Sequence, residues 1–225
     1  MISVKDLYSC DCCDLFSFQL DSHPRSLLCS IDALLDEQGL KSLPEKYSRW
    51  KRTDAWVSKD AFIDRGATIQ GRCIIGCGAT IRSGAVLRDG AVIGQDVLIG
   101  HGVEVKRSVV MRGSCLPHMN YVGDSVIGVN VVFGAGVVTA NVNLFDCNPF
   151  GDAGPATTGV KRFGVFVGDG VRIGCNVVLN PGAVIGRQSV IYPLTNIRGV
   201  IGSNVVVKGG SFPNYDLHPI QVNYR

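Results

Sequence analysis

The sequence is poor in aromatic and charged residues and contains no long apolar run. Aromatic residues make up 8% and charged residues 18% of 225 residues. No run approaches the roughly 20 apolar residues of a membrane-spanning helix, so none is expected. The N-terminus lacks the basic-then-apolar pattern of a secretion signal, which predicts a cytoplasmic protein. The net charge is +3 and the basic residues are scattered, so nucleic acid is not an expected partner.

Leu, Glu and Lys become sparse after residue 55, whereas Val, Ile and the 28 glycines are abundant. That composition excludes a helical bundle and favours short strands joined by turns.

A six-residue period runs through the middle of the chain. Neither a helix, with 3.6 residues per turn, nor a plain strand, with a period of two, maintains such a repeat. Small or β-branched residues sit two positions before each aliphatic residue, and turn residues such as Asp89 and Gly90 lie between. The pattern predicts a β-helix whose coils stack their aliphatic side chains. The aliphatic positions are Val57, Ile63, Ile69, Ile75, Ile81, Leu87, Ile93, Ile99, Val105 and Met111.

The period slips after Met111, resumes at Ile127 and Phe133, and returns from Val167 to Ile197. A second slip places the last hits at Ile201 and Val207. Between these parts, residues 142–164 are rich in Gly, Pro, Asn and Thr, which predicts an extruded loop. Residues 24–39 have one apolar helical face, and we expect this helix to cap the open end of the coil. The predicted organisation is an N-terminal helical cap over 1–50, the β-helix over 51–212 and a tail over 213–225.

The nine cysteines are expected to be reduced thiols. Cys73, Cys115 and Cys175 take small-residue positions of the repeat, which predicts buried, inert side chains. Cys10, Cys12 and Cys13 lack the paired spacing of a zinc site, so no metal is predicted.

The clearest break in the repeat is RGSCLPHMNYVGDSVIG, residues 112–128. Pro117 stands where an aliphatic residue is due, His118 follows, and Tyr121 and Asp124 lie close by. A histidine is the natural general base near neutral pH. A histidine at a coil corner can equally be structural, and the residues alone leave both interpretations open.

Two segments resemble hexapeptide-repeat acyltransferases, especially the acetyltransferase half of the bifunctional uridylyltransferase/glucosamine-1-phosphate acetyltransferase. They are VEVKRSVVMRGSCLPHMNYVGDSVIGVNVVFGAGVVTANV from Val103 and KRFGVFVGDGVRIGCNVVLNPGAVIG from Lys161. The resemblance implies an all-β fold, a single-stranded left-handed parallel β-helix with a small N-terminal helical cap. It also implies a homotrimer with shared sites, acetyl-coenzyme A as co-substrate and an amino sugar phosphate as acceptor.

The resemblance assigns roles to individual residues. It implies that His118 is the catalytic base, that Arg88 and Lys106 bind the sugar phosphate, and that Tyr121 binds the sugar. Further expected contacts are Asn141 beside the acyl group, Lys161 and Arg162 near the acceptor, and Cys175 and Pro193 at coenzyme A.

Several positions depart from the family pattern. Val132 replaces an asparagine, Cys147 replaces a lysine, and Cys175 replaces a small polar coenzyme A contact. The nucleotidyltransferase domain of the bifunctional enzymes is missing, so we expect no uridylyl transfer.

Three functions remain open. The first is N-acetyl transfer to an amino sugar 1-phosphate in UDP-N-acetylglucosamine synthesis, and the second is a non-catalytic sugar-phosphate or nucleotide-sugar binding module. The third is a zinc hydratase, which requires three histidines around the metal, but only His101 and His118 lie in the predicted coil and His218 lies in the tail. Cys115 lies near His118, but its position in the repeat argues against a nucleophile.

Overall fold

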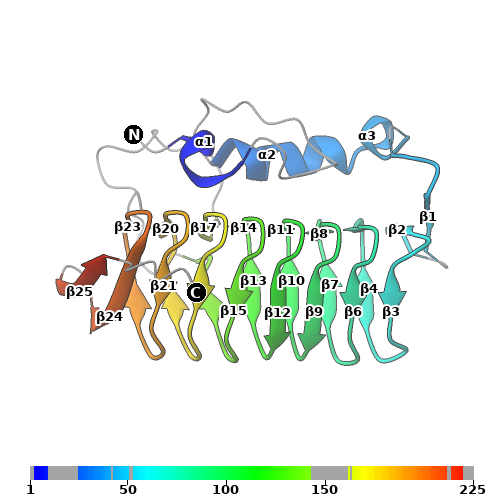
Figure 1. Ribbon diagram of the computed structural model, residues 1–225. Coiled ribbons are helices and arrows are strands. Elements are labelled where there is room, and N and C mark those ends of the chain that lie inside the picture. Colours follow the sequence, from blue (N-terminus) through cyan, green and yellow to red (C-terminus); the bar gives the residue numbers. More distant parts are fainter. Residues whose placement is uncertain are drawn as a thin grey trace, which may run out of the picture.

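The chain winds into a parallel β-helix with three faces and helices laid along one of them (Figure 1). The computed structural model describes residues 3–9, 25–41, 43–50, 53–142, 162, 164–211 and 214–219. The fold class predicted from the sequence, an all-β left-handed parallel β-helix with a small helical segment at its N-terminus, is confirmed.

Each coil places one short strand on each face, and each strand pairs in parallel with its equivalent in the next coil. Face A contains β2 (Trp56–Ser58), β5 (Ile74–Ile75), β8 (Val92–Ile93), β11 (Val109–Val110), β14 (Val126–Ile127), β17 (Phe166–Val167), β20 (Val184–Ile185) and β23 (Val200–Ile201). Face B contains β3 (Phe62–Ile63), β6 (Thr80–Ile81), β9 (Leu98–His101), β12 (Cys115–His118), β15 (Val132–Phe133), β18 (Arg172–Ile173), β21 (Val190–Ile191) and β24 (Val205–Ser211). Face C contains β4 (Thr68–Gln70), β7 (Val86–Arg88), β10 (Glu104–Lys106), β13 (Tyr121–Gly123), β16 (Val138–Thr139), β19 (Val178–Leu179) and β22 (Asn196–Ile197).

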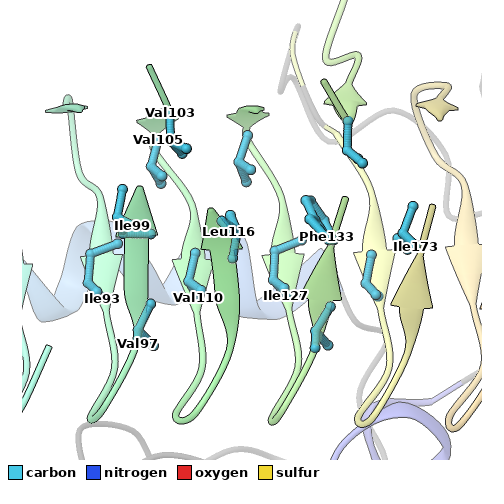
Figure 2. Packing of buried hydrophobic residues seen from close by; sticks show 14 of the residues in the cluster. Ile93, Val97, Ile99, Val103, Val105, Val110, Leu116, Ile127, Phe133 and Ile173 are labelled. Atoms are coloured by element: carbon cyan, nitrogen blue, oxygen red, sulfur yellow. The ribbon is translucent and has the colours of Figure 1, made fainter. Parts of the chain in front are cut away.

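Aliphatic side chains from all three faces meet inside the coil and stack on their equivalents above and below (Figure 2). The predicted inward positions from Val57 to Val105 are correct, and those from Ile75 onward are fully buried. At the next two positions the prediction is wrong by one residue, and from Ile127 onward the predicted inward positions are again correct. Val110 points into the coil in place of Met111, and Leu116 fills the position assigned to Pro117.

The phase changes because one corner loses a residue. Lys106 pairs with Arg88, and Val109 pairs with Val92, so the corner after β10 is one residue shorter than the corner after β7. The next coil repeats the short corner, since Gly123 pairs with Lys106 and Val126 pairs with Val109.

Serine replaces alanine at the small inward positions of these coils. Ser108, Ser114 and Ser125 are fully buried. The Ser114 hydroxyl donates to the Gly128 carbonyl and accepts from the Val131 N–H. The Ser125 hydroxyl donates to the Gly123 carbonyl and accepts from the Val165 N–H at 3.0 Å. Each hydroxyl therefore bridges successive coils from inside and satisfies backbone groups in an apolar interior.

The helices α1 (Val4–Leu7), α2 (Arg25–Leu34) and α3 (Glu37–Lys41) lie along face A, not over an open end as predicted (Figure 1). Leu27, Leu28, Ile31 and Leu35 pack on the outward side chains of face A, which are apolar throughout. These are Ile74, Val92, Val109, Val126, Phe166 and Val184, all buried. The helical segment is therefore a lateral cover.

The single helix predicted over 24–39 is also divided in two. The Asp36 carboxylate accepts a hydrogen bond from the Gly39 N–H at 2.7 Å, the arrangement of an N-cap, and α3 begins at Glu37. Gly39 consequently lies inside α3 and does not end the helix.

The two ends of the coil are covered by antiparallel strands. At the first coil, β1 (Tyr47–Arg49) pairs with β2. At the last coil, β25 (Asn214–Pro219) pairs with β24, which itself pairs with β21 on face B and β22 on face C. These pairings protect edges that would otherwise pair with another chain. No helix in the described ranges is long and apolar enough to cross a bilayer.

We predict that Ser125→Ala destabilises the coil by about 1–3 kcal/mol, because the Val165 N–H loses its partner in a dry interior. Urea unfolding measures the change. Ser203→Ala, at an exposed position, is the matched control and should cost less than about 0.5 kcal/mol. Equal effects of the two substitutions would contradict the bridging role of the Ser125 hydroxyl.

Candidate functional site

The predicted site residues fall at two corners of the coil. We call the corner between faces B and C the BC corner, and the corner between faces C and A the CA corner. Within one coil, His118 lies at the BC corner and Asp124 at the CA corner, with β13 between them.

The BC corner stacks His118 in one column with two other predicted residues. Gly136 N–H donates to the His118 carbonyl at 3.1 Å, Asn176 N–H to the Ala135 carbonyl, and Leu194 N–H to the Cys175 carbonyl. Successive positions along the column are therefore His101, His118, Ala135, Cys175 and Pro193. Adjacent strands are about 4.8 Å apart, so Cys175 lies about 10 Å and Pro193 about 14 Å from His118. The side chains of His118, Cys175 and Pro193 are all exposed.

Face C presents the two basic residues predicted to bind phosphate, and they differ in their partners. The Arg88 guanidinium donates to Glu104 Oε1 at 2.8 Å and to Asp89 Oδ2 at 2.7 Å. Burial alone would lower the pKa of Arg88, but these two carboxylates raise it. Lys106 lies beside Arg88 on the neighbouring strand. Within the described residues Lys106 has no carboxylate partner, so its ammonium is available to an anion.

Tyr121 and Asn141 meet on face C as part of a hydrogen-bonded group. Asn141 Nδ2 donates to Tyr121 Oη at 3.3 Å and to Asp124 Oδ2 at 2.5 Å. Gly123 makes this arrangement possible, because a Cβ there would lie 2.6 Å from Asn141 Nδ2 and 2.7 Å from Tyr121 Oη. Burial raises the pKa of Tyr121, although the hydrogen bond from Asn141 opposes the shift. The phenol is therefore protonated at neutral pH.

Arg107 connects this group to the helical cover. Its guanidinium donates to Asp124 Oδ1 at 3.2 Å and to Asp32 Oδ2 of α2 at 3.3 Å. Burial alone would lower the pKa of Arg107, but the contacts with Asp124 and Asp32 raise it. Asp124 is 2% exposed, so its charge depends on Arg107.

The described residues at the two ends of the predicted loop lie beside the same group. Asn141 precedes its start, and at its end the Gly164 N–H donates to the Asp124 carbonyl at 2.7 Å. Arg162 is exposed and lies two residues before Gly164. Lys161, Cys147 and most of the loop fall outside the described residues, as do Cys10, Cys12 and Cys13.

In one chain, the structure brings together Tyr121, Asn141, Arg88 and Lys106 on face C but leaves His118 at the other edge. No described hydrogen bond joins the His118 side chain to Tyr121 or Asn141. The sequence analysis missed Glu104 and Arg107. Glu104 could have been recognised, because it alternates with the inward Val105 and so faces outward beside Arg88.

The histidines do not gather around one point. His118 pairs with His101 on the next strand, and the His101 Nδ1 lies 2.8 Å from the Ser83 carbonyl. The backbone of His218 pairs with Val206 on β24, four strands from β12, or about 19 Å. In the part of the chain that the structure describes, no three His, Cys, Asp or Glu residues form a metal cluster.

The cysteine predictions hold only for Cys73, which is fully buried. Cys115 lies on the outer side of face B, half-buried between Leu98 and Val132, because Ser114 takes the small inward position. Cys175 is exposed at the BC corner. Burial raises the pKa of the Cys115 thiol, which opposes a nucleophilic role.

The repeat, the stacked coils and the outward polar groups define a hexapeptide-repeat β-helix protein. The sequence profile of the GMPPB C-terminal domain matches residues 69–179, just under half of the chain. A bifunctional sugar-1-phosphate nucleotidylyltransferase/acetyltransferase of Sulfurisphaera tokodaii is 41% identical over 102 residues, 44% of this chain and 25% of that protein. The bifunctional protein GlmU of Methanococcus vannielii is 39% identical over 89 residues, 39% of this chain and 21% of that protein.

The chain thus spans a quarter or less of the length of these curated relatives. The resemblance to their acetyltransferase half, predicted from the sequence, is confirmed. Among solved structures, LpxA of Acinetobacter baumannii covers 73% of each chain at 18% identity, with a TM-score of 0.40. The N-acyltransferase AntD of Bacillus cereus covers 76% of this chain and 82% of its own at 16% identity, with a TM-score of 0.36. Likeness at this level is distant and says nothing about the activity of this chain.

We predict that the buried Cys73 thiol lowers the free energy of unfolding at high pH. Burial raises the pKa of Cys73 to about 11 from 9.0, so the unfolded thiol ionises first and stability falls between these values. The loss is about 2–3 kcal/mol for two pKa units. Urea unfolding of wild type and Cys73→Ala at pH 8 and pH 11 measures it. The other titrating groups are the same in both proteins, so their contributions cancel in the difference between the two free energies of unfolding. A difference that does not change with pH would contradict the assignment.

Proposed function

We propose that the protein is an acyltransferase that moves an acetyl group from acetyl-coenzyme A to the amine of an amino sugar phosphate. The observation that carries the proposal is the coil of residues 118–124. It presents an exposed histidine at one corner and the Tyr121–Asn141–Asp124 group at the other, inside the segment matched by the family profile. The relative from Sulfurisphaera tokodaii is a bifunctional nucleotidylyltransferase/acetyltransferase by name, which supports the same reaction class.

His118 would act as the general base. The acceptor ammonium releases one proton to solvent, and the amine attacks the thioester carbonyl while His118 accepts the second proton from the nitrogen. The tetrahedral intermediate then collapses by breaking the C–S bond, and the thiolate takes the proton from His118. A backbone N–H would stabilise the oxyanion. No step requires a covalent acyl-enzyme, in keeping with the raised pKa of Cys115.

Lys106 would be the main phosphate ligand. Arg88 also faces the acceptor side, but its charge is already shared by Glu104 and Asp89. Arg162, with Lys161 beside it, would add positive charge where the loop rejoins the coil. We propose an amino sugar 1-phosphate as acceptor, as in UDP-N-acetylglucosamine synthesis, and a cytoplasmic location.

The coenzyme would lie along the BC corner. Cys175 and Pro193 follow His118 in the same exposed column, about 10 and 14 Å away, a direction suited to an extended thioester arm. Asn141 would contact the acyl group. Because His118 and Asn141 lie at opposite edges of face C, we propose a homotrimer in which the corner of one subunit faces the next and completes each site.

The alternative is a sugar-phosphate binding or assembly module without turnover. Val132 favours it, because this exposed apolar residue stands where the resembling enzymes have asparagine. The engagement of Arg88 by two carboxylates favours it as well.

We predict that His118→Ala lowers kcat by about 10²–10⁴-fold, the usual contribution of a general base. Thiol release from acetyl-coenzyme A is followed with a panel of amino sugar 1-phosphates. His101→Ala is the matched control, since His101 occupies the same column one coil away, and it should retain activity within a few-fold. Unchanged turnover in the His118 variant would reject the mechanism, and no turnover in wild type would favour the binding module.

We predict that Lys106→Met weakens binding of an amino sugar 1-phosphate by roughly ten-fold, because a charge-assisted contact is lost. Arg88→Met should weaken it less, since that charge is already paired. Isothermal titration with the sugar phosphate and with the unphosphorylated amino sugar separates phosphate recognition from sugar recognition. A larger loss for Arg88→Met, or equal losses for both ligands, would contradict the assignment.

A further inference from the structure

We propose that Asp124 is a positioning residue that fixes the orientation of the Asn141 amide. Through that amide, Asp124 also fixes the side on which the Tyr121 hydroxyl accepts a hydrogen bond and the side on which it donates one. The site then presents one hydrogen-bond acceptor, Asn141 Oδ1, next to one donor, the Tyr121 hydroxyl. The inference rests on the proposed function, because it concerns how the same site recognises its ligands.

Asp124 is itself held in one place. Its N–H donates to the Lys106 carbonyl at 3.0 Å, and its own carbonyl accepts from the Gly164 N–H at 2.7 Å. Its φ of 48° lies in the left-handed region, which aspartate and asparagine tolerate better than most residues. The side chain is 2% exposed, and Arg107 donates to its Oδ1. The carboxylate is therefore buried, paired with the Arg107 guanidinium and aimed by the short corner at which it sits.

An ionised carboxylate only accepts hydrogen bonds, so only the NH₂ end of the Asn141 amide can face it. The 2.5 Å contact from Asn141 Nδ2 to Asp124 Oδ2 is thus a constraint on which way the amide points. With Nδ2 held by Asp124 and Tyr121, the amide oxygen is the atom left for a ligand. A neutral residue at position 124 would permit the opposite orientation.

The fixed orientation of the Asn141 amide also determines the direction of the hydrogen bonds that Tyr121 makes. Because Asn141 Nδ2 donates to Tyr121 Oη at 3.3 Å, the phenol accepts on that side and its own hydrogen is left for another acceptor. Burial keeps the phenol protonated. Arg107, Asp124, Asn141 and Tyr121 thus form a directed chain of hydrogen bonds that ends in a donor on face C.

An acceptor at Asn141 Oδ1 beside a donor at the Tyr121 hydroxyl selects a ligand group that carries an N–H next to an oxygen. Two parts of the proposed substrates have that chemistry, namely the amide units of the coenzyme A arm and an amino sugar with its neighbouring hydroxyl. Coenzyme A and the amino sugar phosphate can be titrated separately, so binding experiments distinguish the two sources.

The test compares Asp124→Asn with Asp96→Asn, its matched control. Asp96 occupies an equivalent left-handed position at another corner, where it is exposed and contacts Gln95. A double variant, D124N/N141D, keeps one amide and one carboxylate in contact but reverses their positions. Thermal unfolding, titration with coenzyme A and with the amino sugar phosphate, and the ¹⁵N side-chain amide signals of Asn141 are measured for each protein.

We expect Asp124→Asn to shift the Asn141 amide signals and to weaken one of the two ligands by about ten-fold, as for loss of an oriented hydrogen bond. Asp96→Asn should leave both unchanged. The double variant should not recover the affinity, because the orientation of donor and acceptor at position 141 is now reversed. Its melting temperature should also stay below that of wild type, because Arg107 then faces an amide at position 124.

Two results would overturn the proposal. One is recovery of both stability and affinity in the double variant, which would make the contact merely structural. The other is unchanged affinity in a folded Asp124→Asn protein. These readouts do not require turnover, so an inactive wild type would reject the transferase without deciding the role of Asp124.

Discussion

The stacking of one coil on the next is the constraint on which the rest of the structure depends. Parallel strands about 4.8 Å apart dictate which type of residue can stack on each position along a column. Inside, the column must be aliphatic or a hydroxyl that bridges coils, as with Ser125 and Val165. Outside, the same geometry gathers residues that are far apart in the chain. His118 and Cys175 are 57 positions apart in sequence yet two steps apart in one column. Chemistry on such a scaffold is therefore arranged along columns and across corners.

The site lies where this regularity is interrupted. Both short corners place a charged residue in the left-handed region, Arg107 with φ 43° and Asp124 with φ 48°. Asp89 precedes them and Asn141 follows them in the same column. The positive Arg107 therefore lies between two negative residues, Asp89 and Asp124. The charges compensate one another between coils, which allows Asp124 to remain buried. Shortening of the corner and burial of the carboxylate are thus one local departure from the repeat.

Much of the fold could be predicted from the sequence, because stacked coils require similar residues at regular intervals along the chain. The inward positions up to Val105 and those from Ile127 onward were predicted from that period. The one-residue loss after Lys106 could not be placed, since Val110 and Met111 are both apolar and either continues the pattern. The structure assigns Val110 to the interior and Met111 to the helical cover. The placement of that cover was missed for a related reason. The outward residues of face A, such as Val92 and Val126, are apolar, but a period of six does not reveal which face they share.

The candidate site was predicted from residue type, and the arrangement of its residues was not predicted. Tyr121 and Asp124 lie close to His118 in the sequence, but the coil places His118 and Asp124 at opposite edges of face C. The one group that a single chain does assemble, Tyr121 with Asn141 and Asp124, depends on Gly123, whose missing side chain leaves room for the amide. His118 has no polar partner from that group within the described residues. One chain therefore places the exposed His118 and the Tyr121–Asn141–Asp124 group at opposite edges of face C, because the strand β13 lies between the two corners.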